Sequence, residues 1–294
     1  MEPQRKSGSI LVTGANGQLG KEICRQLGPA AVPLPRAILD ITDPANVADL
    51  VSQHQPRAVI NCAAWTAVDA AETESSACWV ANATAVEFLA DACTAHGATL
   101  VQVSSDYVFG ADRTRRTPYR ESDPPGPLGV YGESKLAGET AARRAARHLI
   151  IRTCGLYSVG DAGPVRGRNF LDTMLTLAAA RQPLRVVNDQ VCTPSFVPHV
   201  ATAMLGLLAA DAQGLFHLTN AGATSWHGLA EALFAAAGIT ADLTAIPTSS
   251  YPTPAERPAY SVLDTTAATR MLGAPLPDWR DAVAAYASDL KRDA

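Results

Sequence analysis

The chain has 294 residues, 47% of them hydrophobic and 18% charged, with a formal net charge of −4. This length and apolar content allow a sizeable core, in a chain that is long for one domain and short for three. The negative charge argues against nucleic acid or an anionic membrane surface as the main partner.

The first half of the chain alternates short β-rich runs with helical stretches. Residues 9–14 (SILVTG) are typical of a buried strand, and apolar residues at helical spacing follow in 18–27. The prolines of 31–35 (AVPLP) allow only an edge or terminal strand there. Asp43 and Pro44 are typical of a helix N-cap and first turn. Further strands are expected at 58–64, 99–106 and 148–153, and further helices at 75–96 and 132–147.

This order predicts an α/β fold, a Rossmann-like doubly wound parallel sheet with helices on both faces. After Tyr157 the rhythm changes, and a smaller α/β substrate-binding lobe is expected. We predict an NAD(P)-binding domain at 7–158 and the lobe at 159–292, with the chain returning to the first domain in places. The lobe is expected to contain a glycine-rich stretch at 158–169, helices at 170–180, from Pro198 and from Ser225, strands at 184–189 and 214–220, a proline-rich loop at 249–260 and two final helices.

Cysteine and histidine usage bears on compartment and metal binding. The six cysteines are scattered without a CxxC pair, and the six histidines form no HExxH motif. The start MEPQRKSGS lacks the apolar core of a secretory signal, and stretches such as VATAMLGLLAA are too short to span a bilayer. We therefore expect a cytoplasmic protein with reduced thiols, no membrane contact and no metal site.

A glycine-rich turn follows the first predicted strand directly. In GANGQLG, Gly14, Gly17 and Gly20 have GxxGxxG spacing, one residue longer than the usual dinucleotide fingerprint. Glycine permits close backbone approach, and the helix that follows offers free N–H groups to a pyrophosphate. Strand, turn and helix in this order predict a dinucleotide site.

The residue after the second strand usually selects the cofactor. Arg36 lies at about that position, and arginine favours a 2′-phosphate. We therefore expect NADPH, with NADH possible, and Asp40 and Ile41 as candidates to flank the adenine. The alternative is that Arg36 is only a solvated surface charge.

The stretch VYGESKLAGE places Tyr131 and Lys135 four residues apart, on one helical face. An ammonium about 4 Å from a phenolate gains roughly 4 kcal/mol at an effective dielectric of about 20, which is about three pKa units. A tyrosine and a lysine four residues apart also occur by chance in many helices, so the pair alone does not establish a catalytic role. An earlier strand, however, ends in VSSDYVFG, where Ser105 offers a hydroxyl, and an adjacent one ends in NCAAWTAVDAAE. A turn-capping role is the alternative for these serines.

Taken together, GANGQLG, LDITD, NCAAWTAVDAAE, VSSDYVFG, VYGESKLAGE, IIRT, GRNF and ERPAYSVLD resemble the extended short-chain dehydrogenases/reductases, and within them the dTDP-4-dehydrorhamnose reductase family. The resemblance runs in order along nearly the whole chain. It implies reduction of dTDP-4-dehydro-L-rhamnose to dTDP-L-rhamnose by NADPH, in a homodimer.

The resemblance also implies residue roles. Tyr131 would donate the proton, Lys135 would hold the nicotinamide ribose and lower the tyrosine pKa, and Ser105 would supply the hydroxyl. The cofactor contacts would be Gly14, Gly17, Gln18, Leu19, Gly20, Ala63, Ala64, Trp65 and Thr66, and the substrate contacts would be Ser105, Asp106, Tyr107, Asn169 and Arg257.

One departure from the family concerns the sugar. After IIRT the family often has a Ser-Trp pair, whereas this chain has Cys154 and Gly155. Loss of the aromatic face removes stacking contact and is expected to open the pocket. A dehydratase is disfavoured, because no glutamate follows Asp106. Another keto-sugar reductase or an epimerase stays open, as does a non-catalytic NADP-binding regulator like the beta subunit of methionine adenosyltransferase.

Overall fold

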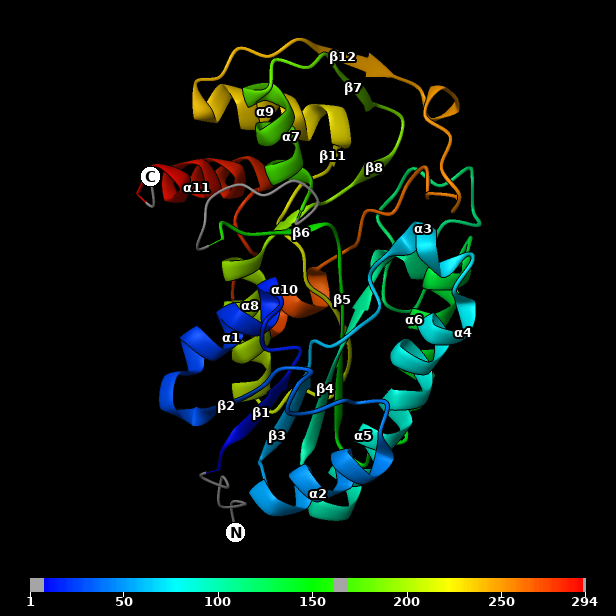
Figure 1. Cartoon of the computed structure of the whole chain (residues 1–294), viewed down its shortest axis with the longest axis vertical. Helices are drawn as coiled ribbons and strands as arrows, with labels where there is room; N and C mark the ends of the chain where they lie inside the picture. The colour runs from blue at the N-terminus through cyan, green and yellow to red at the C-terminus, as the bar shows by residue number, and fades with distance from the viewer. Residues whose placement is uncertain (1–7, 161–168, 293–294) are drawn as a thin grey trace.

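A parallel sheet of six strands forms the centre of the computed structural model, which describes residues 8–160 and 169–292 (Figure 1). β1 lies inside the sheet, paired with β2 on one side and β3 on the other. This arrangement confirms the predicted fold class. In spatial order the strands are β10 (Gly214–His217), β5 (His148–Thr153), β4 (Thr99–Ser105), β3 (Ala58–Asn61), β1 (Ile10–Thr13) and β2 (Ala31–Leu34).

Helices cover both faces of the sheet because its strands are apolar on both sides. In β1, Ile10 and Val12 belong to one buried cluster and Leu11 to the other, as the alternation of side chains along a strand requires. Figure 1 shows the two helical layers on opposite sides of the sheet. One layer contains α1 (Gln18–Leu27), α8 (Val197–Ala209) and α10 (Thr266–Leu272), and the other contains α2 (Pro44–His54), α5 (Ala85–His96) and α6 (Val130–Ala142).

Local signals in the sequence located several element ends correctly. The Asp43 carboxylate accepts hydrogen bonds from the N–H groups of Ala45 and Asn46, at 2.9 and 3.2 Å, and Pro44 begins α2. β2 is the edge strand that its prolines predicted. α6 differs from the prediction, because it begins at Val130 and ends at Ala142.

The helix predicted at 75–96 is interrupted. It consists of α4 (Ser75–Trp79), a π-helical turn, η2 (Val80–Thr84), and α5. Within η2, Asn82 directs its side-chain amide at the backbone of Trp65. A π-turn that places a polar side chain in this way is often found at functional sites.

The second half of the chain builds a separate apolar cluster and also returns to the sheet. Tyr157, Leu229 and Tyr286 are among the buried residues of this cluster, which lies at the top of Figure 1. β10, α8 and α10 belong instead to the sheet and its layers. The elements outside the sheet layers are α3 (Val68–Ala71), β6 (Leu156–Tyr157), α7 (Phe170–Ala179), β7 (Leu184–Val187), β8 (Val191–Cys192), β9 (Ser195–Phe196), β11 (Thr224–Ser225), α9 (Trp226–Ala237), β12 (Leu243–Ile246) and α11 (Trp279–Arg292), with 3₁₀ turns η1 (Gly28–Ala30), η3 (Asp106–Val108) and η4 (Thr248–Ser250).

The division into residues 7–158 and 159–292 stays a prediction. Residue 7, the other residues of the polar start before Gly8 and residues 161–168 of the glycine-rich stretch lie outside the described residues. Among the residues that are described, no helix has both the length and the apolar character needed to cross a membrane.

Candidate active site

The carboxyl end of β4 and the start of α6 bring Ser105 and Tyr131 together. The Tyr131 phenol lies beside the Ser105 hydroxyl, close enough for that hydroxyl to lower the pKa of the phenol. The Ser105 hydroxyl in turn accepts the N–H of Tyr107 at 3.1 Å and donates to Asp106 Oδ1 at 3.1 Å. Ser105 therefore also caps the short turn η3, so the turn-capping role and the contact with Tyr131 occur at the same hydroxyl.

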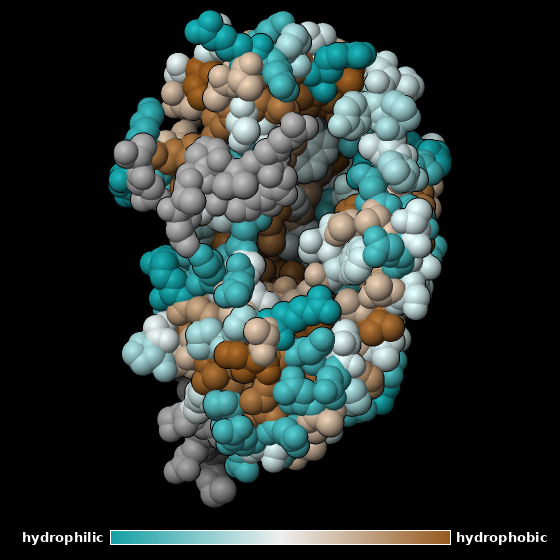
Figure 2. Space-filling model, viewed as in Figure 1, coloured by the Kyte–Doolittle hydropathy of each residue, from teal (hydrophilic) through white to brown (hydrophobic). Residues whose placement is uncertain are grey.

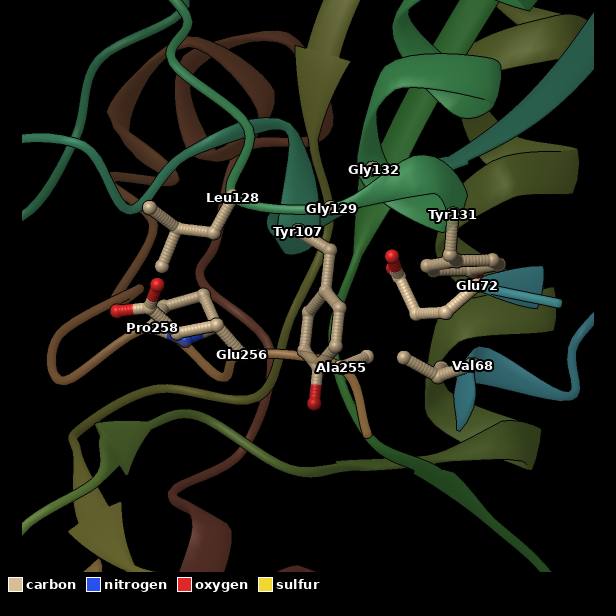
Figure 3. A pocket seen from close by; sticks show the side chains of 10 residues that line it. All are labelled: Val68, Glu72, Tyr107, Leu128, Gly129, Tyr131, Gly132, Ala255, Glu256 and Pro258. Carbon is tan, nitrogen blue, oxygen red and sulfur yellow. The ribbon is translucent and has the colours of Figure 1, made fainter. Parts of the chain in front are cut away.

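Tyr107 lies beside Tyr131 and lines two neighbouring cavities. The two rings meet edge to face, with centroids 5.7 Å apart. In Figure 3, Glu72 and Tyr131 lie on one side of Tyr107, and Glu256 and Pro258 lie on the other. The cavity in this view is about 10 Å³, room for about one water molecule. Tyr107 connects it to a much larger cavity, described below.

Lys135 is buried one turn after Tyr131, with its side chain directed at the sheet. Its Nζ donates to the carbonyl oxygen of Val103 at 2.6 Å, and the residue is only 3% exposed. Burial lowers the pKa of the Lys135 ammonium to about 8, although the nearby Glu139 carboxylate opposes the shift.

The prediction that Lys135 lowers the pKa of Tyr131 is wrong for this structure. Burial raises the pKa of the Tyr131 phenol, and the nearby Ser105 hydroxyl offsets only part of that rise. The Lys135 ammonium donates to the Val103 carbonyl and is not among the main causes of the shift. In this arrangement Tyr131 is a neutral phenol over the physiological pH range, which suits a proton donor.

A buried ion pair holds the same helix against the sheet. The Arg152 guanidinium donates to both oxygens of the Glu139 carboxylate at 2.7 Å, and the Ser104 hydroxyl donates to one of them at 2.7 Å. Arg152 and Glu139 are 3% and 2% exposed. Such a pair is costly to break because it would leave a buried charge without a partner.

Two further residues that the sequence did not single out position the site. Glu72 accepts the N–H of Val130 at 3.0 Å and so caps the start of α6, where Gly129 has no side chain to do so. Asn82 accepts the N–H of Trp65 at 2.9 Å and donates to Ser134 in α6 at 3.0 Å. For Asn82, the available signal in the sequence was an asparagine among the mostly apolar residues of a predicted helix.

The glycine-rich turn has the geometry of a close backbone approach. Gly14 has a φ of 61°, and a Cβ there would lie 2.7 Å from the backbone nitrogen of Ala63. A Cβ at Gly20 would meet the carbonyl oxygen of Gly14. α1 begins at Gln18, with Gly17 as its N-cap, so its first N–H groups are directed at the carboxyl edge of the sheet.

Several predicted cofactor residues contact protein with their side chains. The Leu19 and Ile41 side chains belong to buried apolar clusters, so any cofactor contact at these two positions would involve their backbone. The Gln18 side chain accepts hydrogen bonds from Ser158 and from Asn169, at 3.0 and 3.1 Å. Ala63, Ala64, Trp65 and Thr66 follow β3, adjacent to the glycine turn in the sheet.

Arg36 and Asp40 lie just after β2, at the edge of the site. Arg36 is extended, with its side chain 88% exposed and a nitrogen 3.7 Å from Asp40. Hydrogen bonds from Thr42 lower the pKa of the Asp40 carboxyl. The exposed guanidinium is accessible to an anionic ligand, while its weak ion pair with Asp40 contributes little stability.

A cavity of about 380 Å³ is lined by residues of η3, α7, β7 and the start of α9. Figure 2 shows the molecule hollowed between its upper and lower parts. Arg257 lines the cavity and pairs with both Asp69 oxygens at 2.8 and 2.9 Å, and this pairing lowers the pKa of Asp69. Arg185 also lines it and forms no ion pair with any described residue. The full lining is Asp69, Tyr107, Phe170, Thr173, Met174, Arg185, Val186, Val187, Gln190, Trp226, Tyr251, Thr253 and Arg257.

The remaining predicted substrate residues are placed differently. Asp106 is buried beside Ser105, receives a hydrogen bond from Ser261 at 2.6 Å, and has its pKa raised by burial. Asn169 caps α7 by accepting the N–H of Asp172 at 2.9 Å. The structure thus brings Tyr107 and Arg257 to the cavity wall. Asp106 does not line the cavity, and the Asn169 side chain is used within the protein. In residues 8–160 and 169–292 no group of three or more His, Cys, Asp or Glu residues is arranged to hold a metal ion.

The fold and the site define a class. A parallel sheet with a glycine turn after its first strand, and a Tyr-Lys pair one helical turn apart facing a strand-end serine, characterise the extended short-chain dehydrogenases/reductases.

Comparison with known proteins narrows this class. A family model described as RmlD substrate binding domain matches residues 8–292, so the chain belongs to that family. The dTDP-4-dehydrorhamnose reductase of Burkholderia thailandensis is 42% identical over 301 residues, covering 96% of this chain and 98% of that protein. The enzyme of the same name from Salmonella typhimurium is 40% identical, with coverage of 92% and 94%. The crystal structure of dTDP-4-dehydrorhamnose reductase from Bacillus anthracis in complex with NADP has a TM-score of 0.90 at 33% identity, covering 96% of this chain and 99% of that one.

The lowered pKa of Lys135 predicts how stability depends on pH. Below about pH 8 the ammonium is charged in both the folded and the unfolded chain, and its burial cost is fully present. Between about pH 8 and the ordinary lysine value of about 10.4, the folded chain releases the proton first, so stability rises with pH. Replacing Lys135 with Met removes this dependence. We expect the wild type to gain up to about 3 kcal/mol relative to Lys135→Met over this range.

Chemical denaturation of both proteins at several pH values from 7 to 10 measures this difference. Lys291→Met, at the exposed end of α11, is the matched control and should show a constant difference from wild type. A constant difference for Lys135→Met as well would contradict the lowered pKa.

Proposed function

We propose that this protein reduces the 4-keto group of dTDP-4-dehydro-L-rhamnose to the hydroxyl of dTDP-L-rhamnose, using NADPH. The observation that carries the proposal is the position of Tyr131 beside Ser105 and against the Tyr107 ring, which lines the large cavity. Relatives that carry this enzyme name at about 40% identity over nearly the whole chain support the substrate. The NADP complex of the Bacillus anthracis protein supports the cofactor.

The residues present fit the cofactor. A Cβ at Gly14 would meet the backbone of Ala63, and one at Gly20 would meet the Gly14 carbonyl, so glycine keeps this turn tight. The free N–H groups at the start of α1 suit a pyrophosphate. Arg36 would take the 2′-phosphate, and Lys135 would hold the nicotinamide ribose. When bound, the reduced nicotinamide supplies a hydride to the carbonyl carbon.

The chain's own groups supply the proton and the orientation. Tyr131 gives its phenolic proton to the carbonyl oxygen as that oxygen gains charge, and Ser105 donates a hydrogen bond to the same oxygen. A solvent proton then restores the phenol, while Lys135 keeps this face of α6 against the sheet through the Val103 carbonyl. The carbonyl becomes a secondary alcohol by gaining one hydride and one proton.

The cavity would receive the nucleotide part of the substrate. Arg185 is the cation without a carboxylate partner among the described lining residues, and we assign it to the diphosphate. Asp106, Tyr107 and Arg257 would contact the sugar. Asn169 would act through the cap of α7 and its bond to Gln18, without touching substrate.

We also propose that the protein is a cytoplasmic homodimer. Its six cysteines are all free thiols, which agrees with a reducing compartment. Light scattering after size exclusion should give a mass of about twice the 30.8 kDa of one chain. A mass equal to one chain would overturn the dimer.

The decisive experiment follows NADPH oxidation with dTDP-4-dehydro-L-rhamnose generated in place. Wild type should form dTDP-L-rhamnose, and Tyr131→Phe should lose at least about 100-fold in turnover while still binding NADPH. Tyr119→Phe is the matched control, because its buried hydroxyl has no hydrogen-bond partner among the described residues. This control should keep wild-type turnover.

Each other result identifies an alternative. Full activity in Tyr131→Phe would refute the assignment of the proton donor. Interconversion of sugars without net NADPH consumption would indicate an epimerase. NADPH binding without turnover, together with copurification of a catalytic partner, would indicate a regulatory subunit.

Arg36 predicts the choice between the two nicotinamide cofactors. Replacing it with Ala removes a charge-assisted contact to the 2′-phosphate, worth about 1.5–3 kcal/mol, and should raise the KM for NADPH roughly 10- to 100-fold. The KM for NADH should change little, because NADH lacks that phosphate. Equal changes for both cofactors would show that Arg36 is only a surface charge.

A further inference from the structure

The position where the family often carries an aromatic residue is not an empty gap in this protein. Gly155 follows β5 with a φ of 47°, a left-handed conformation that suits glycine. A Cβ on Gly155 would lie 3.1 Å from Cη2 of the Trp226 indole and 3.3 Å from Pro194. The expectation that the pocket is simply opened at this point is therefore wrong, because the Trp226 ring occupies the space beside Gly155.

Trp226 is held at this place by the start of α9. Ser225 caps the helix by accepting the N–H of Gly228 at 3.0 Å, and its hydroxyl donates to Asn188 at 2.7 Å. The indole packs against the Phe170 ring, with centroids 4.9 Å apart. Both rings line the large cavity, and both are only half-buried, so each leaves part of its surface for a ligand.

The position of Gly155 indicates on which side of the site Trp226 lies. Gly155 directly follows Cys154, which is buried near Asp106, the neighbour of Ser105. The sugar carbonyl must lie at Ser105 and Tyr131, so a ring packed beside Gly155 is on the sugar side of the site. The unpartnered Arg185 is the group suited to the diphosphate.

We infer that Trp226, reaching across from α9, forms the aromatic wall against the hexose of the substrate, and that the absent side chain at Gly155 makes room for it. This inference rests on the proposed function. An indole face presents a large apolar surface that packs well on the C–H groups and the 6-methyl of a deoxyhexose. Trp226 is thus a specificity-determining residue for the sugar and not for the nucleotide.

The test compares two ligands that differ only in the sugar. Calorimetry with dTDP-L-rhamnose and with dTDP is done on wild type, Trp226→Ala and Trp226→Phe in the presence of NADP. Trp226→Ala should weaken dTDP-L-rhamnose about tenfold or more and leave dTDP within about twofold. Trp226→Phe keeps a ring and should lose about threefold or less. Trp79→Ala, at an exposed tryptophan of α4, is the matched control and should change neither affinity.

A second variant changes the contact between Trp226 and Gly155 at the glycine. Gly155→Ala adds a methyl group that displaces the indole, so it should weaken dTDP-L-rhamnose selectively as well. Thermal unfolding of every variant identifies those that have lost the fold. If Trp226→Ala does not fold, Trp226→Leu takes its place, since it keeps apolar volume without the ring.

The outcomes separate this inference from the proposed function. Equal weakening of dTDP and dTDP-L-rhamnose, or no weakening of either, would overturn the role of Trp226 while wild-type turnover still supports the reductase. Absence of wild-type turnover with the keto-sugar would refute the proposed function itself, and with it the hexose assignment.

Discussion

The attachment of α6 to the sheet is the constraint on which the candidate site depends. Lys135 and Glu139 lie one turn apart on the buried face of this helix, and each is bonded to the sheet, through the Val103 carbonyl and through Arg152. The two contacts fix both the rotation of the helix and its position along its axis. Tyr131 is then held at the end of β4, beside Ser105.

Polar contacts also connect the nucleotide half of the site to the second lobe. The side-chain oxygen of Gln18, the first residue of α1, receives hydrogen bonds from Ser158 and Asn169. Asn169 at the same time caps α7, which contributes Phe170 and Met174 to the cavity wall. The glycine turn and the substrate cavity are therefore parts of one hydrogen-bonded unit, although they are distant in the sequence.

The sequence was informative where the interactions are local. The Asp43 cap, the edge position of β2 and the helix that carries Tyr131 and Lys135 depend on neighbouring residues, and each was predicted correctly. The contacts of Asn82 and Glu72 were missed because their partners lie 17 and 58 residues away. The direction of the Tyr131 pKa was wrong because it depends on burial, which spacing alone does not reveal. The contact between Trp226 and Gly155 could not be predicted either, because the two residues are far apart in the sequence.

The pairing of Arg257 with Asp69 affects how a substrate would approach. Arg257 is already neutralised within the cavity, so its positive field does not extend far from the wall. Arg185 is left as the lining cation that projects an uncompensated field, in a protein whose formal charge is −4. A recessed cavity with low-dielectric walls concentrates such a field at its mouth. Under the proposed assignment, this single guanidinium would draw a polyanionic nucleotide sugar towards an otherwise repulsive molecule, with the diphosphate at Arg185 and the sugar inward.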